Sequence, residues 1–277
     1  MMFFLIAKFF LIIKYIVALI AIIVIYRLIR KKPTNNANWA PDQKILAYAD
    51  IIGSKVNIHN IRNFKYNTET DYVADYYDKS VDIGNIKTLD FVFVPYSKFK
   101  ILAHTFLTFG FEDGSHIAIS VEIRKKIGQN FSSFKSLFKQ YELMYVVADE
   151  NDVIKLRTNY RHEPVHLYPM NATKEQIQKM FLSMLERANQ LKDKPEFYNP
   201  FTNTCTTNIA NHIRKITPQG FPFSFKVILP GYSEELAYDL GIINTNLPYA
   251  DTRRKFFIND KAIKSPDALN FSVKIRM

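Results

Sequence analysis

The feature that most constrains the fold is a pair of alternating apolar and polar runs, at 101–111 and 116–124, separated by Glu112-Asp113-Gly114. Three-residue hairpin loops commonly end on a residue in the left-handed conformation, which glycine adopts readily. Such a loop pairs Phe111 with Ser115. In this register every odd position from 107 onward is apolar on both runs, and a shift by one residue would mix the two faces. The sequence therefore predicts a long antiparallel hairpin with one apolar face.

The even-numbered face of the predicted hairpin carries the polar groups. His104 falls opposite Glu122, and directly opposed side chains have Cβ atoms about 4.5–5.5 Å apart. A carboxylate at this range accepts the imidazole N–H and favours the charged ring. Ser120 and His116 share this face, and His116 could serve as an alternative base, although no acid lies opposite it. Thr105 is the one polar exception on the other face. The alternative for His104 and Glu122 is a cross-strand pair without chemistry.

Cys205 is the only cysteine of the chain, which excludes a disulfide framework and a cysteine-rich metal site. It lies in a polar stretch, and isoleucines with helical spacing follow it. We expect a helix that begins near this residue, with Asn203 or Thr204 as the N-cap. A helix N-terminus favours the thiolate, especially beside a cationic imidazole. The alternative is a buried structural cysteine.

Together these residues are the parts of a thiol acyl-transfer site. Cys205 would be the nucleophile, His104 the proton shuttle and Glu122 the group that orients the imidazole. The backbone N–H of Cys205 and the side chain of Asn203 would stabilise the oxyanion, with Ser120 in support. A strand histidine, an acid on the neighbouring strand and a later cysteine that opens a helix follow the order expected of a circularly permuted papain-like core. The sequence predicts no metal site and no cofactor, and it contains no Gly-rich phosphate loop.

The remaining periodicity indicates an α+β fold, because antiparallel strands are mixed with separate helices. The best-defined helix has a capping box at Thr173 and Gln176 and one apolar stripe. Besides the hairpin, strands are predicted at 56–61, 90–95, 143–148 and 164–169, and helices at 132–141, 149–157, 174–192 and 205–215.

Residues 1–32 predict a membrane anchor. The stretch from Phe9 to Ile29 is apolar apart from Lys14, Arg27 and two tyrosines, and its 21 residues are close to the number that a spanning helix needs. A cleaved signal peptide is less favoured, because the stretch is long and ends in basic residues without a small-residue cleavage pattern. Residues 1–32 carry six positive charges and no acidic residue, out of a net charge of +11 for the chain. The charge left on the rest of the chain gives less support for nucleic-acid binding. The flanking charges slightly favour a cytoplasmic domain.

The predicted organisation has four parts. After the anchor at 1–32 come a polar linker at 33–49, a thiol domain at 50–216 and a C-terminal extension at 217–277 packed on that domain. The sequence does not indicate what the extension does.

Several blocks of the chain resemble the bacterial family named for the N-terminal periplasmic domain of Lnb, a lipoprotein N-acyltransferase. His104, Glu122 and Cys205 match the family's catalytic positions, and the threonine at 204 replaces an asparagine of the family pattern. Arg62, Ser120 and Arg124 match motif positions to which we assign no certain role. The matched blocks are Asn60–Tyr66, Ala103–Phe111, Ser120–Arg124, Tyr141–Glu150, Leu156–Thr158, Pro195–Asn199 and Cys205–Asn208.

The resemblance implies a domain on the periplasmic side of the inner membrane, against the charge count of the flanks. It also implies that the cysteine takes an acyl chain from a phospholipid as a thioester and passes it to the α-amine of a lipoprotein. Two other functions stay open. The same residues could form a peptidase or amidase for periplasmic or cell-wall peptides, or the domain could bind lipid or a partner without catalysis. No nucleic-acid partner is expected.

Overall fold

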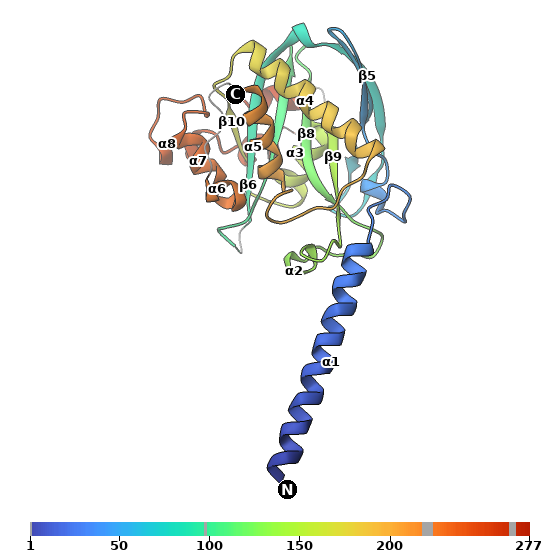
Figure 1. The fold of residues 1–277 in the computed structure, drawn as a ribbon. Coiled ribbons are helices and arrows are strands. Elements are labelled where there is room, and N and C mark those ends of the chain that lie inside the picture. Colours follow the sequence, from blue (N-terminus) through green and yellow to red (C-terminus); the bar gives the residue numbers. More distant parts are fainter. Residues whose placement is uncertain (1, 97–98, 218–223, 266–269) are drawn as a thin grey trace.

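The computed structural model describes residues 2–96, 99–217, 224–265 and 270–277. Helix α1 (Met2–Arg30) projects away from the rest of the chain, which forms one rounded domain (Figure 1). Its segment Lys8–Arg30 has 23 residues, and an 18-residue window within it has a mean hydropathy of 2.8. At 1.5 Å per residue this segment is about 35 Å long, enough for a hydrocarbon core of about 30 Å. By length and composition, α1 therefore qualifies as a membrane span.

A central sheet organises the domain, with strand order β1-β2-β9-β8-β7-β6-β10 and β5 paired to β2. Its pairs are antiparallel except for one parallel contact between β2 and β9. The strands are β1 (Tyr48–Ile52), β2 (Lys55–Arg62), β5 (Tyr76–Asp82), β6 (Ile86–Pro95), β7 (Ala103–Phe111), β8 (His116–Arg124), β9 (Glu142–Asp149) and β10 (His166–Pro169), beside a small pair, β3 (Lys65–Tyr66) and β4 (Tyr72–Val73).

The hairpin of β7 and β8 has the predicted register. The Phe111 N–H donates to the Ser115 carbonyl at 2.9 Å, and Gly114 has a φ of +79°. The ladder runs from the loop as far as the pair Phe106 and Ser120, and there it ends although both strands continue. The sequence predicted that His104 would be paired directly with Glu122, but the ladder ends before this pair, so that prediction is corrected. Beyond Phe106 and Ser120 the two strands separate.

Helices cover both faces of the sheet (Figure 1). On the odd-numbered face lie α4 (Lys174–Asp193) and α5 (Cys205–Ile216), and Phe109 meets Phe181 of α4 edge to face at 5.0 Å. The capping box of α4 is present as predicted. The even-numbered face packs against α3 (Glu150–Lys155) and against the C-terminal helices α9 (Asn259–Ile263) and α10 (Phe271–Lys274), and Phe106 belongs to this second core.

The helix predicted at 132–141 is a single turn, α2 (Ser133–Ser136). Its apolar side chains have helical spacing, yet Phe134, Leu137 and Phe138 are exposed. A short helix in a protein depends on packing of its apolar face, and here no part of the described domain covers that face. The predicted helix at 149–157 is α3 followed by a π-helical turn, Leu156–Tyr160.

The C-terminal segment packs closely on the domain. Phe271 and Ile275 are fully buried in the second core, and Arg276 contacts both Asp90 and Glu150, with closest distances of 2.7 and 2.6 Å. The helices of this segment are α6 (Phe225–Ile228), α7 (Ser233–Asp239), α8 (Tyr249–Lys255), α9 (Asn259–Ile263) and α10 (Phe271–Lys274).

The segment predicted as a linker lies against the domain. Trp39 is only 4% exposed, and the guanidinium of Arg124 lies 4.3 Å from the centre of its ring. Arg124 also donates hydrogen bonds to the carbonyls of Gln43 and Lys44 at 2.9 and 2.8 Å. The first strand begins at Tyr48, two residues before the predicted domain boundary. This segment therefore joins α1 to the domain through many fixed contacts.

Candidate functional site

A cavity of about 370 Å³ opens at the end of the sheet where β7 and β8 separate. Phe131, Ser133 and Ser136, in and beside α2, line this cavity, and Figure 1 shows α2 at the end of the domain from which α1 leaves. The structure brings three predicted residues to its wall from distant parts of the chain: His104 from β7, Glu122 from β8 and Cys205 from the start of α5.

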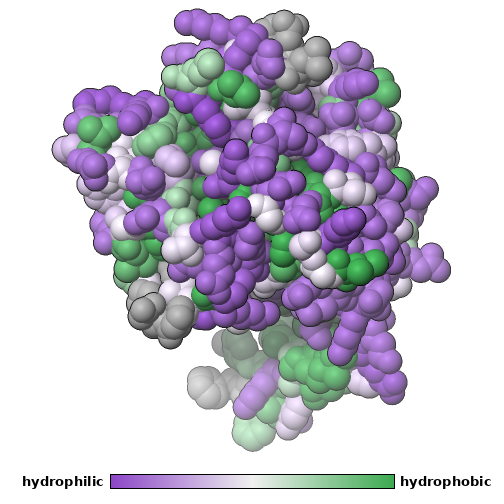
Figure 2. Space-filling model, turned by 90° about the horizontal axis from the view of Figure 1, so that it is seen from above, coloured by the Kyte–Doolittle hydropathy of each residue, from purple (hydrophilic) through white to green (hydrophobic). Residues whose placement is uncertain are grey.

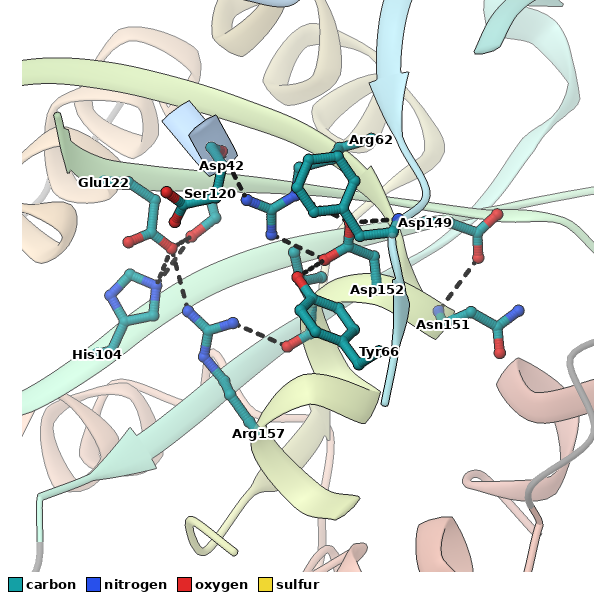
Figure 3. A network of polar contacts seen from close by, with 12 residues as sticks. Asp42, Arg62, Tyr66, His104, Ser120, Glu122, Asp149, Asn151, Asp152 and Arg157 are labelled. Atoms are coloured by element: carbon teal, nitrogen blue, oxygen red, sulfur yellow. Dashed lines mark hydrogen bonds and ion pairs between the residues drawn. The ribbon is translucent and has the colours of Figure 1, made fainter. Parts of the chain in front are cut away.

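Glu122 is the centre of a polar cluster, and Figure 3 shows three side chains that point toward its carboxylate. Its Oε1 accepts hydrogen bonds from His104 Nε2 at 3.0 Å, Ser120 Oγ at 2.8 Å and Arg157 Nη2 at 3.0 Å. Ser120 Oγ also lies 2.8 Å from His104 Nε2. Burial opposes the charged carboxylate, but first His104 and then Arg157 and Ser120 hold the pKa of Glu122 well below its usual value.

The imidazole of His104 connects Glu122 to the thiol of Cys205. Burial lowers the pKa of His104, yet the charge of Glu122 and the hydrogen bonds to Cys205 and Glu122 outweigh burial and raise it to about 9. Burial likewise raises the pKa of Cys205, but the hydrogen bond and charge of His104 and the contacts with Thr105 lower it to about 7. The pair therefore favours thiolate and imidazolium over the two neutral groups.

Helix α5 begins at Cys205, as expected from the sequence. Thr204 is the N-cap, and it forms a capping box with Thr207. The hydroxyl oxygen of Thr204 accepts a hydrogen bond from the backbone N–H of Thr207 at 3.2 Å. The first N–H groups of a helix have no acceptor within the helix, so the N-terminal turn of α5 directs N–H dipoles toward the thiol and its surroundings.

Thr105 is a site residue that sequence reasoning did not select. Its hydroxyl lies 3.2 Å from that of Thr206, which in turn lies 3.7 Å from the thiol of Cys205, and the hydroxyl and backbone N–H of Thr105 help to lower the pKa of that thiol. It is fully buried. The signal was visible in the sequence, because Thr105 is the single polar break in the apolar face of the hairpin.

Arg157 is a second residue that the sequence did not single out. It lies in the π-helical turn, where its Nη1 donates to the carbonyl of Val153 at 2.8 Å and its guanidinium lies 5.1 Å from the centre of the Phe106 ring. Isolated π-turns are frequent at functional sites. No local pattern predicts that this turn would aim Arg157 at Glu122.

Asn203, predicted as an oxyanion donor, is engaged elsewhere. Its amide nitrogen donates to the carbonyl of Phe197 at 3.1 Å, and its own carbonyl accepts from Asn208 at 2.9 Å. Two tyrosines, Tyr96 and Tyr198, line the cavity instead. Burial raises the pKa of both phenols, and the nearby charge of Cys205 raises it further. The two phenols therefore stay protonated and can donate hydrogen bonds near the sulfur.

The other histidines lie away from the sulfur. His212 is buried between the hydroxyls of Tyr145, at 2.9 Å, and Ser183, at 2.7 Å, and burial first of all lowers its pKa to about 4. His116 contacts the carbonyl of Gly114 at the far end of the hairpin. Within the described ranges, no group of three or more His, Cys, Asp or Glu residues is arranged to hold a metal ion.

Beside the site, a buried ion pair supports the cavity wall. Arg62 donates to both carboxylate oxygens of Asp152 at 2.8 Å, and Tyr66 and the backbone of Phe64 donate to the same carboxylate (Figure 3). Asp152 is fully buried, so this pair fixes the end of β2 against α3. Arg62 and Tyr66 both line the cavity.

The comparisons with known proteins address the family. No curated protein and no solved structure matches the chain. Residues 72–231, more than half of the 277 residues, match the family described as the Lnb N-terminal periplasmic domain. The match begins later than the predicted boundary at 50 and runs past the one at 216. It contains β6 to β8, the π-helical turn and α5. The predicted resemblance is confirmed, and the chain belongs to the Lnb N-terminal periplasmic domain family.

Proposed function

We propose that this protein is a membrane-anchored thiol acyltransferase that acts on phospholipid and lipoprotein at the periplasmic face of the inner membrane. The observation that carries the proposal is His104, which contacts the thiol of Cys205 and the carboxylate of Glu122 in one open cavity. The family supports the periplasmic side, and the apolar helix α1 supports the anchor. We further propose that the core is a circularly permuted papain-like one.

In the first half-reaction the thiolate of Cys205 attacks the ester carbonyl of a phospholipid. The carbonyl electrons move to the oxygen, where the backbone N–H of Cys205 and the hydroxyl of Tyr96 or Tyr198 stabilise the charge. As the intermediate collapses, the bond to the glycerol oxygen breaks. His104 gives its proton to that oxygen, and lysophospholipid leaves. The acyl chain remains on sulfur as a thioester.

In the second half-reaction an α-amine attacks the thioester carbonyl. His104, now neutral, takes the proton of the amine, the carbon–sulfur bond breaks and the thiolate returns. Glu122 stabilises the imidazolium at the start and the end of the cycle, while Ser120 and Arg157 keep that carboxylate in place. Because Nε2 of His104 faces Glu122 and Ser120, Nδ1 is the ring nitrogen left for the sulfur.

Acyl trapping tests the proposal. Full-length protein in phospholipid vesicles is analysed by intact mass spectrometry before and after neutral hydroxylamine, which cleaves thioesters. We expect an acyl mass on the wild type that hydroxylamine removes, and no such mass on Cys205→Ala or His104→Gln. His116→Gln is the matched control, since His116 lies on the same strand face far from the sulfur. A wild type that stays unmodified in lipid but cleaves peptides would instead support the peptidase. Inertness in both assays would leave a non-catalytic binding domain.

A further inference from the structure

Exposed apolar side chains gather around the mouth of the cavity. They come from the β6–β7 loop, the segment between β8 and β9, and the loop before α5, and the largest exposed fractions are 71% for Phe134, 60% for Phe99 and 59% for Phe201. We call this group the apolar rim; it comprises Phe99, Ile101, Ile127, Phe131, Phe134, Leu137, Phe138 and Phe201. So many exposed large apolar residues in one region indicate a contact surface.

The rim lies beside the end of the membrane helix. Lys139, which directly follows the last rim residue of its segment, donates from Nζ to the carbonyl of Leu28 in α1 at 3.1 Å. Lys31, just after α1, places its ammonium 5.8 Å from the ring of Phe197. Figure 1 shows α2 and the β6–β7 loop at the end of the domain from which α1 leaves. A bilayer that surrounds α1 would therefore meet these loops.

The charge of the rim has one sign. The segment 125–141 contains Lys125, Lys126, Lys135 and Lys139 and no acidic residue. Aromatic side chains interleaved with lysines are typical of segments that lie in the headgroup region, where the rings enter the acyl boundary and the ammonium groups attract anionic lipid.

The end of the domain opposite α1 has a mainly hydrophilic surface. Figure 2 looks down on that end and shows a mainly hydrophilic surface with only scattered apolar residues. Ile52, at the β1–β2 turn, is 73% exposed there, yet it lies among polar neighbours such as Ser54 and Asp82, which hydrogen-bond at 2.9 Å. The apolar surface is thus concentrated at the end that carries α1.

The rim and the reactive sulfur share one cavity. Phe131, Ser133 and Ser136 of the β8–β9 segment line the same cavity as Cys205 and His104. An acyl chain that left the bilayer beside the rim would enter the cavity that holds the thiol.

We propose that the apolar rim is a second membrane contact, seated in the headgroup region of the leaflet that α1 enters, with anionic phospholipid as its partner. The membrane contact stands independently of any chemistry. Its role as the entry for acyl chains rests on the proposed acyltransferase function.

A depth measurement tests the contact. Because Cys205 is the only cysteine, a Cys205→Ser background accepts a single environment-sensitive NBD label at Phe134→Cys or, as the matched control, at Ile52→Cys. The full-length chain is placed in vesicles of phosphatidylcholine with or without phosphatidylglycerol. We expect blue-shifted emission and quenching by doxyl-labelled lipid at position 134 only, with both effects stronger when phosphatidylglycerol is present. Equal, water-like emission at both positions overturns the proposal.

A second experiment separates the contact from the chemistry. The double variant Phe134→Ser/Phe138→Ser is compared with Ile52→Ser for the rate of thioester formation in vesicles and for the alkylation of Cys205 by iodoacetamide. We expect a several-fold lower acylation rate in the double variant only, with alkylation unchanged in both. An unchanged acylation rate refutes the entry role. Insertion of position 134 without acylation of the wild type refutes the acyltransferase function and leaves the membrane contact intact.

Discussion

Glu122→Gln is the most direct test of how the site sets the charge of its sulfur. The substitution keeps the size of the side chain and removes the charge that faces His104 Nε2 at 3.0 Å. Burial then dominates at His104, so its pKa falls from about 9 toward or below the ordinary 6.5. Without an imidazolium beside it, the buried thiol loses its main source of stabilisation as a thiolate.

The size of the effect follows from the two pKa values. The rise of the His104 pKa from 6.5 to about 9 corresponds to about 3 kcal/mol in favour of the charged ring, at 1.36 kcal/mol per pH unit. Cys205 is coupled to this charge, and its pKa stands at about 7 where the ordinary value is 9.0. In Glu122→Gln we therefore expect the thiol pKa to rise by about two pH units or more.

The assay is the rate of alkylation of Cys205 by iodoacetamide as a function of pH. Wild type should be alkylated with a midpoint near the pKa of about 7. The rate at a single pH is a poor readout, because a thiol of higher pKa gives a more reactive thiolate. A pKa that is two pH units higher makes the thiolate about tenfold more reactive. The midpoint itself should move to 9 or above. Glu112→Gln, in the loop of the same hairpin, is the matched control and should not move it. An unmoved midpoint in Glu122→Gln would refute the coupling.

Three further predictions concern the surroundings of the site. Thr105→Val removes a hydroxyl that helps to lower the pKa of the thiol and should raise the alkylation midpoint by about half to one pH unit; a shift larger than that of Glu122→Gln would contradict it. Arg62→Met leaves the buried Asp152 unpaired and should cost about 3–5 kcal/mol in urea unfolding, whereas Arg62→Lys keeps a cation there and should cost less. Arg276→Met removes the cation that pairs with the fully buried Glu150, whose pKa is held at about 2, and should lower the free energy of unfolding by a similar amount. The ionised carboxylate of Glu150 stabilises the fold at pH values above the unfolded pKa near 4.3, and this stabilisation is lost as the pH falls to about 2. The stability lost in Arg276→Met should therefore become smaller as the pH falls from about 4.3 to about 2. A deficit that grows there would count against it.

The sequence predicted the central part of the fold because that part is regular. The parity of the β7–β8 hairpin and the stripe of α4 each follow one period over many residues. Strand β5 (Tyr76–Asp82) escaped prediction because it lies toward the sheet edge, where polar residues occupy both of its faces. The C-terminal helices are single or double turns that exist through packing on the sheet, so their residues carry no periodic signal.

The same contrast holds for the site. The hairpin pattern was enough to predict that His104 and Glu122 lie close together, although the ladder ends at Phe106 and Ser120 and only their side chains meet, at 3.0 Å. Cys205 could be placed at a helix start from its capping neighbours. Arg157 could not be found, because its direction depends on a π-turn set by tertiary contacts. Asn203 was selected for its position beside the cysteine. Its amide faces the carbonyl of Phe197, a contact between loops that sequence spacing does not encode.

The separation of β7 and β8 beyond Phe106 and Ser120 has a consequence for the whole protein. The thiol belongs to α5 on one face of the sheet and the imidazole lies on the other face, and the two groups meet at the end of the sheet where β7 and β8 are no longer paired with each other. If the two strands stayed paired for two more residues each, the sheet would separate the thiol from the imidazole without altering either side chain. Strands β6 and β9 hold the outer sides of β7 and β8 here, with Val94 paired to His104 and Met144 paired to Glu122, so the opening is a fixed part of the sheet.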